Sequence, residues 1–233
     1  MKIDLREYAT ELRYWLEAFK PFVDKVSHPS LMRLQEEIEN GRDNLRPSFG
    51  WKLAAPIQLI DADRYDGTVK SPHVVRVTWQ FEAEFKSRPD SRKTFLWTVE
   101  NMVTHVRVYS AKNDEEILHF HHDMKNKGQL GPHSHMQFSE HYQKDKGKIP
   151  IAVPRFPTVA MLPTDCLDFV LAEFFPFEWP KSQSTLVGLA ALQKRQRDRM
   201  MRISHAIASG WTGSRMTPIA AVQNCYEPDL QIA

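Results

Sequence analysis

The chain has 233 residues, with 31 Lys and Arg side chains against 29 Asp and Glu side chains, so its formal net charge at pH 7 is only +2. Hydrophobic residues make up 42% of the chain and charged residues 26%, which excludes a disordered or fibrous protein. Because the net charge is close to zero, any contact with nucleic acid must come from a local basic patch.

The sequence has neither a cysteine framework nor a signal or membrane-spanning segment. The only cysteines, Cys166 and Cys225, cannot form a disulfide framework, and without a Cys-x-x-Cys pair a thiolate zinc site is excluded. The N-terminal residues alternate between charged and apolar types, so they lack the apolar central region of a signal peptide. The longest weakly charged stretch, 149–162, is broken by prolines and cannot span a bilayer. We therefore expect a cytoplasmic protein that does not bind a membrane.

The N-terminal part is predicted to be helical. Asp4 is placed to cap a helix over residues 4–20, in which apolar residues recur with the 3.6-residue helical period and which Pro21 ends. A shorter helix is expected over residues 30–39, and residues 42–72 are rich in loop signals.

The middle of the chain is predicted to form an antiparallel sheet. Residues 75–85 alternate strictly between apolar and polar types, which is typical of a half-buried strand. Further strands are expected over 94–109, with a break or bulge near Glu100-Asn101, over 117–123 and over 133–138. Short polar connections favour antiparallel pairing.

Helices return after the proline-rich stretch. Thr164 is expected to cap a helix that ends before Pro176, and a last helix is expected from about Ser184 to Ala208. The predicted fold is therefore α+β, with an antiparallel sheet of about four or five strands and N-terminal and C-terminal helices packed on it. We expect a single domain over 1–233, made of a helical part (1–45), a sheet (73–140) and C-terminal helices (164–210).

The histidines are unevenly distributed along the chain. Of ten, six fall within 23 residues, namely His119, His121, His122, His133, His135 and His141. Because side chains alternate across a strand, His119, His121 and Asp123 share one face of the third predicted strand, and His133 and His135 share one face of the fourth. If these strands are antiparallel neighbours, we expect Asp123 opposite His133 and His121 opposite His135.

Such a cluster suits more than one chemistry. Neutral imidazoles are common ligands of zinc, so His121, His133 and His135 are candidate ligands of a divalent metal such as zinc. Alternatively, His121 and His135 exchange protons with a phosphodiester in metal-free RNA cleavage. In a third interpretation the His and Asp side chains only hydrogen-bond to one another on a solvated sheet face.

Basic residues supply candidate phosphate contacts. Lys194, Arg195, Arg197, Arg199 and Arg202 lie within nine residues of the last predicted helix and form a candidate nucleic-acid-binding patch. A solvated helix face is the alternative for these residues. Arg155, between two prolines, is a candidate anion contact near the histidines or else part of an ordinary salt bridge.

The spacing of His133, His135 and Glu140 matches the first metal motif of cupins, H-x-H-x4-E. The second cupin motif needs a later strand histidine, and none follows before His205, which falls in a predicted helix. The expected sheet is also small for a jelly roll. A cupin-like, metal-dependent small-molecule enzyme is therefore kept only as an alternative.

The stretch from Gly131 to Phe175 resembles the C-terminal signature of a poorly characterised group of bacterial proteins. That signature joins an H-P-x-S-H-L strand to a short R-I-P or P-R-x-P segment, and then to T-P and an apolar helix ending in paired aromatics. The counterparts here are His133-Ser134-His135, Pro154-Arg155-Phe156-Pro157, Leu162-Pro163-Thr164 and Phe174-Phe175. The stretch is similar, more distantly, to small toxins of the TumE type. The resemblance implies a setting among toxin–antitoxin or defence genes, with nucleic acid and a protein from the same operon as partners.

The leading hypothesis is a bacterial defence or toxin-like effector that cleaves nucleic acid, chiefly RNA. Its candidate catalytic residues are His119, His121, Asp123, His133, His135 and Arg155. The alternative from another class is a non-enzymatic subunit of a defence complex, in which the histidines are structural.

Overall fold

The computed structural model describes residues 2–41, 48–65, 72–86, 96–124, 134–138, 156–185 and 187–213, except for the side chains of 39–41, 48–49, 157 and 210–213. The strands are β1 (Lys2–Asp4), β2 (Ser48–Lys52), β3 (Ile57–Gln58), β4 (Val75–Lys86), β5 (Leu96–Ser110), β6 (Glu116–Met124), β7 (Ser134–Phe138) and β8 (Phe156–Pro157). The α-helices are α1 (Leu5–Phe19), α2 (His28–Gly41), α5 (Pro163–Phe174), α6 (Glu178–Thr185) and α7 (Leu189–Gly213). Two 3-10 turns, Lys20–Phe22 and Lys25–Ser27, join α1 to α2.

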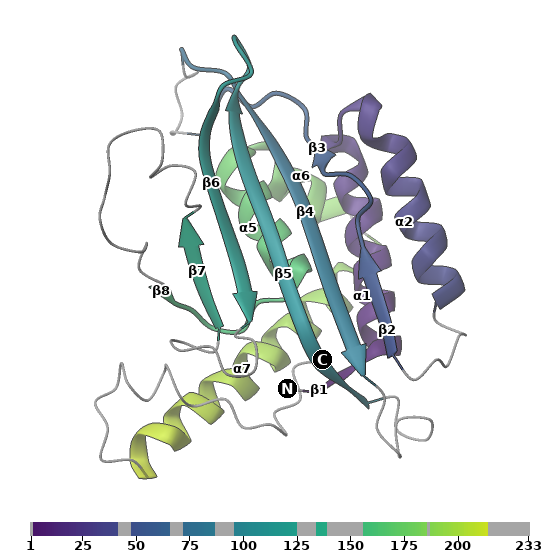
Figure 1. Cartoon of the computed structure of the whole chain (residues 1–233), viewed down its shortest axis with the longest axis vertical. Coiled ribbons are helices and arrows are strands. Elements are labelled where there is room, and N and C mark those ends of the chain that lie inside the picture. Colours follow the sequence, from purple (N-terminus) through teal and green to yellow (C-terminus); the bar gives the residue numbers. More distant parts are fainter. Residues whose placement is uncertain are drawn as a thin grey trace.

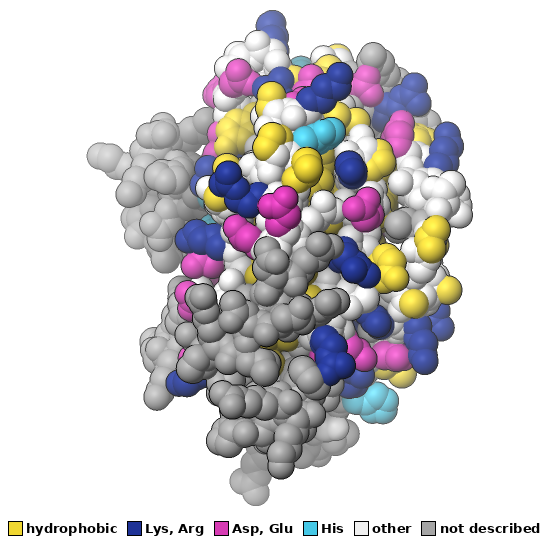
Figure 2. All heavy atoms as spheres, turned by 90° about the vertical axis from the view of Figure 1, so that its right-hand side faces the viewer, with side chains coloured by type: hydrophobic (Ala, Val, Ile, Leu, Met, Phe, Trp, Pro, Cys, Tyr) yellow, Lys and Arg dark blue, Asp and Glu magenta, His cyan; other side chains and the backbone are white. Residues whose placement is uncertain are grey.

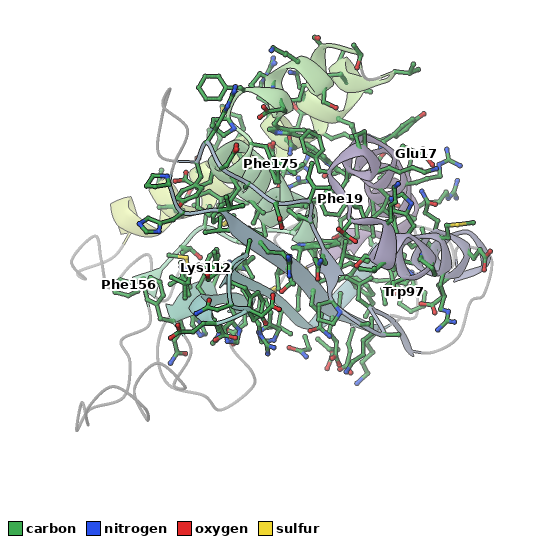
Figure 3. The ribbon with its side chains drawn as sticks, turned by 90° about the horizontal axis from the view of Figure 1, so that it is seen from above. Glu17, Phe19, Trp97, Lys112, Phe156 and Phe175 are labelled. Carbon is green, nitrogen blue, oxygen red and sulfur yellow. The ribbon has the colours of Figure 1, made fainter. Side chains whose placement is uncertain are left out.

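The described strands form one antiparallel sheet, in the order β2-β4-β5-β6-β7-β8, and the two short strands β1 and β3 pair with β5 and β4. Helices α1, α5 and α6 lie behind this sheet in Figure 1 and on one side of it in the view from above (Figure 3). The predicted α+β class, with N-terminal and C-terminal helices on an antiparallel sheet, is confirmed.

The two sides of the sheet differ because side chains alternate along each strand. The odd-numbered residues of β4, from Val75 to Phe85, are buried, whereas its even-numbered residues are partly or fully exposed. We call the side that carries the even-numbered residues of β4 the open face. The expected bulge is also present, because Glu84 pairs with Asn101 and Phe85 with Val99, so that Glu100 is the extra residue.

The core lies between the sheet and the helices. Asp4 caps α1 as predicted, since its carboxylate accepts hydrogen bonds from the backbone N–H groups of Arg6 and Glu7. The apolar face of α1 then packs on the sheet, where the rings of Phe19 and Trp79 are 5.7 Å apart (Phe19 is labelled in Figure 3).

A buried ion network ties α1, α5 and α7 together. The guanidinium of Arg199, 0% exposed, donates two hydrogen bonds to the Glu11 carboxylate, over 2.9 and 3.1 Å, and one to Asp165 Oδ1 over 2.6 Å. The hydroxyl of Thr164 donates to Glu11 Oε1 over 3.1 Å. We call Arg199, Glu11 and Asp165 the core ion network.

Two helix predictions are wrong at their boundaries. Thr164 does not cap α5, because Leu162 occupies the N-cap position and Asp165 accepts the hydrogen bond of its backbone N–H. The predicted helix over 184–208 is divided, because α6 ends at Thr185 and Gly188 has a left-handed φ of 87°, which a continuous helix does not allow. Residues 42–72 were expected to be loop-rich, so the strands β2 and β3 within this range were not predicted.

No helix in the described part of the chain combines the length and apolar character needed to cross a bilayer.

Candidate functional site

The candidate site lies on the open face, where four neighbouring strands, β4 to β7, bring their residues into rows. One row runs across the sheet through Gln80, His105, His121 and Gln137, and the next through Glu82, Val103, Asp123 and His135. Residues in the same row point to the same side of the sheet, with Cβ atoms about 4.5–5.5 Å apart between adjacent strands. The rows therefore concentrate imidazole and carboxylate groups on β5, β6 and β7.

Three of these side chains are arranged like the ligands of a metal ion. One ligand atom each of His121, Asp123 and His135 lies within 4.8 Å of the other two. The Oδ1 atom of Asp123 is 2.6 Å from Nε2 of His135, and its Oδ2 atom is 3.7 Å from Nε2 of His121. Among the described residues this is the one such group of three or more His, Cys, Asp or Glu side chains. We call it the His–Asp–His site.

The short contact between Asp123 and His135 is not an aligned hydrogen bond. Within the described residues, neither Asp123 Oδ1 nor either ring nitrogen of His135 has a partner that meets hydrogen-bond geometry, although all three atoms are buried. Buried polar atoms normally have such a partner. The orientation therefore leaves a carboxylate oxygen and an imidazole nitrogen side by side without an aligned hydrogen bond, and to hold one cation the two atoms would have to move apart by a few tenths of an ångström, from 2.6 Å to about 3.3 Å.

The predicted strand pairing is correct, but the predicted register is wrong by two residues. Asp123 lies opposite His135 rather than His133, and His121 lies opposite Gln137 rather than His135. A shift of two residues keeps every side chain on its face, so the expected convergence of histidines and Asp123 is retained. His133 and Arg155 lie outside the described residues, and so do His141 and Glu140.

Sequence reasoning missed His105 and Arg107, which β5 adds to the open face. His105 lies opposite His121, and its Nδ1 atom is 3.3 Å from Nε2 of His119. Burial first, and then the nearby His121 and Arg107, lower the pKa of His105 below its ordinary value. At neutral pH His105 is therefore an uncharged imidazole. Its position in the alternating part of β5 was the signal that could have revealed it.

His122 belongs to the other side of β6. Its Nε2 atom is 2.8 Å from the hydroxyl oxygen of Ser134, which also donates a hydrogen bond to the carbonyl oxygen of Val159 over 3.1 Å. Burial lowers the pKa of His122 to about 4. His122 is therefore a neutral core residue that holds β6, β7 and the segment before α5 together. Strand alternation predicts only that it lies on the face opposite His121.

The basic residues of α7 lie in the helical layer, not beside the His–Asp–His site. Arg199 is removed from the predicted patch altogether, because it is buried in the core ion network with α1 and α5. Lys194, Arg197 and Arg202 are exposed, and Arg195 donates to the backbone oxygen of Glu7. The patch is thus smaller than predicted and lies on the side of the sheet away from the site.

The α2 side of the molecule shows no concentration of one charge either. Among its described residues, Lys and Arg side chains are interspersed with Asp and Glu side chains (Figure 2).

Cys166 is no nucleophile, because it is 4% exposed and burial raises the pKa of its thiol.

Known proteins offer no guide to this site, because no family model, curated protein or solved structure matches the chain.

Proposed function

We propose that the His–Asp–His site binds a divalent metal ion and that the protein is a metal-dependent phosphodiesterase acting on RNA. The observation that carries the proposal is the convergence of two imidazoles and one carboxylate, all within 4.8 Å, from two neighbouring strands. Two His and one carboxylate is a ligand set of catalytic zinc sites, in which a fourth position stays open for water or substrate.

Burial favours a metal over metal-free acid–base catalysis. A general acid or base must come within hydrogen-bonding distance of the substrate. His135 is 0% exposed, so it does not reach a phosphodiester bound at the surface. A buried imidazole can nevertheless hold a metal from the protein side, and His135 presents Nε2 toward the carboxylate of Asp123.

The other two ligands leave the site accessible from the open face. The side chains of His121 and Asp123 are 19% and 24% exposed, so solvent and substrate approach from their side. A divalent cation there supplies a Lewis acid and lowers the pKa of a water molecule that it binds. His121, Asp123 and His135 hold and orient that cation, and the strands fix their positions.

Arg107 gives the open face, which also carries Glu82 and Glu84, a positive charge for an extended anionic substrate. Arg107 lies on this face with its side chain 39% exposed, and its ion pair with Glu116 is 4.0 Å long, so little energy holds it there. Val103, opposite Asp123, is four residues from Arg107 on the same strand, which corresponds to about 13 Å. A cation and a guanidinium at that separation suit a ligand with several phosphates, such as RNA, better than a small molecule.

The toxin-like role in a bacterial defence system stays part of this proposal and rests on the resemblance of residues 131–175 alone. Induced expression in a bacterial host is expected to arrest growth, and Asp123→Asn is expected to relieve the arrest. Growth that is unaffected by the wild-type protein contradicts the toxin role but not the metal site.

The biochemical test uses tag-free protein stripped with EDTA and reloaded with Zn²⁺, Mn²⁺ or Mg²⁺. We expect metal-dependent cleavage of labelled single-stranded RNA, lost in Asp123→Asn and His135→Ala and retained in the matched control His205→Ala, an exposed histidine of α7. If the metal-loaded protein leaves RNA and DNA intact, the phosphodiesterase proposal is wrong. If the stripped protein binds no metal, the metal centre is wrong as well.

A further inference from the structure

A second pair of imidazoles lies on the open face next to the His–Asp–His site. His105 on β5 and His119 on β6 are diagonal neighbours, because His105 pairs with His121 and His119 with Arg107. Their facing ring nitrogens, Nδ1 and Nε2, are 3.3 Å apart, and their rings are tilted by 46° with centroids 5.5 Å apart. Neither residue belongs to the group of three that forms the His–Asp–His site.

The separation of the two nitrogens matches that of two ligands on one cation. With metal–nitrogen distances of about 2.0–2.1 Å, two ligands of a tetrahedral zinc ion are about 3.3 Å apart. Without a metal, the same two nitrogens form a hydrogen bond, so they already face each other. Because His105 and His119 project from adjacent strands in the middle of the sheet, little rearrangement is needed for both to face one cation.

A third imidazole borders the pair. The ring of His121 is 5.5 Å from the ring of His105 and 6.4 Å from that of His119, measured between centroids. With the metal about 3 Å from each ring centre, three imidazoles around one tetrahedral ion have centroids about 5 Å apart. His121 therefore lies between the two groups, with Nε2 directed to Asp123 and its ring next to His105.

We propose that His105 and His119 form a second cation site, specific for borderline metals that prefer imidazole, such as Zn²⁺ or Cu²⁺. The site uses residues other than those that hold the first metal, apart from the neighbouring ring of His121. A cation bound there places positive charge between the His–Asp–His site and Arg107, along the path proposed for an extended anionic substrate. Only that last role rests on the proposed function.

The number of bound ions tests the proposal. Tag-free protein stripped with EDTA is titrated with Zn²⁺ by calorimetry, and the metal retained after gel filtration is measured by mass spectrometry. We expect about two equivalents in the wild type and in His205→Ala. We expect about one equivalent in His105→Ala/His119→Ala, and about one in Asp123→Asn/His135→Ala.

Because His119 is only 5% exposed, its loss affects packing, so His105→Gln serves as a milder variant, and circular dichroism checks that each variant is folded. Cu²⁺ added to Asp123→Asn/His135→Ala is expected to give an electron paramagnetic resonance spectrum with nitrogen coupling, which disappears when His105→Gln is added. The second site is overturned if folded His105→Gln and His105→Ala/His119→Ala still bind two equivalents of Zn²⁺. It is also overturned if the wild type binds one equivalent and Asp123→Asn/His135→Ala binds none. If the wild type binds one equivalent and only the His105 and His119 substitutions abolish it, the second site is supported and the His–Asp–His metal centre is refuted.

Discussion

The core ion network allows a direct test of the packing of α7 against α1 and α5. Substituting Arg199 with Met keeps the approximate shape of the side chain but leaves the carboxylates of Glu11 and Asp165, 1% and 8% exposed, without their cation. Removing one partner of a buried ion pair typically costs about 3–5 kcal/mol. Since Arg199 makes hydrogen bonds to both carboxylates, we expect the upper part of that range.

Urea unfolding followed by tryptophan fluorescence measures this cost. With a urea dependence of about 2–3 kcal/mol per molar for a domain of this size, the midpoint of Arg199→Met is expected to fall by about 1–2 M. The matched control is Arg197→Met, because Arg197 is an exposed residue of the same helix, and its effect is expected to stay within about 0.5 kcal/mol. Glu11→Leu/Arg199→Met is expected to cost less than the sum of the two single changes, since it removes both charges together.

Two results would refute this reasoning. If Arg199→Met unfolds at the same urea concentration as Arg197→Met, the guanidinium is not buried against the carboxylates. If the Glu11 and Arg199 substitutions add without coupling, the two residues are not partners.

Three further predictions concern single residues. The pKa of His122 is about 4 in the folded protein and 6.5 when unfolded, so between these values the unfolded chain binds more protons, and the free energy of unfolding should fall by up to about 3 kcal/mol from pH 6.5 to 4. Urea midpoints measured with EDTA should depend less on pH in His122→Gln. If their pH dependence is the same as in the wild type, His122 is not a neutral core imidazole. Gly188→Ala should cost about 1–2 kcal/mol from its φ of 87° alone, since the added Cβ meets the ring of Tyr14 at an ordinary 3.5 Å; an unchanged thermal midpoint would show that the left-handed turn is absent. In Cys225→Ser protein, Cys166 should react with a thiol reagent only in urea, because its thiol is buried and its pKa is raised; rapid reaction of the folded protein counts against this placement of α5.

The sequence predicts the long elements of the fold well because their patterns are local. The alternation of β4 and the cap of α1 at Asp4 are properties of a few neighbouring residues, and both are found in the structure. The short strands β2 and β3 are different, since two to five residues carry too little periodicity to predict and pairing with β4 defines them.

The candidate site was predicted in part, for the same reason. Alternation alone places His121 and Asp123 on one face, but the register between β6 and β7 depends on a connection too long to fix it. His105 was within reach of prediction, because it lies in the alternating part of β5 and pairs with His121 on the next strand along the chain. The burial of Arg199 was not, because its carboxylate partners lie 188 and 34 residues away along the chain.

The same sequence separation has a consequence for the order in which the protein is completed during synthesis. Glu11 emerges from the ribosome 188 residues before the guanidinium that neutralises it. Until α7 emerges, burying Glu11 and Asp165 leaves negative charge in the core without a counterion, which opposes docking of α1 and α5. The helical layer is therefore expected to close late, and until α7 has emerged the apolar helix faces of the growing chain stay exposed to association with other chains.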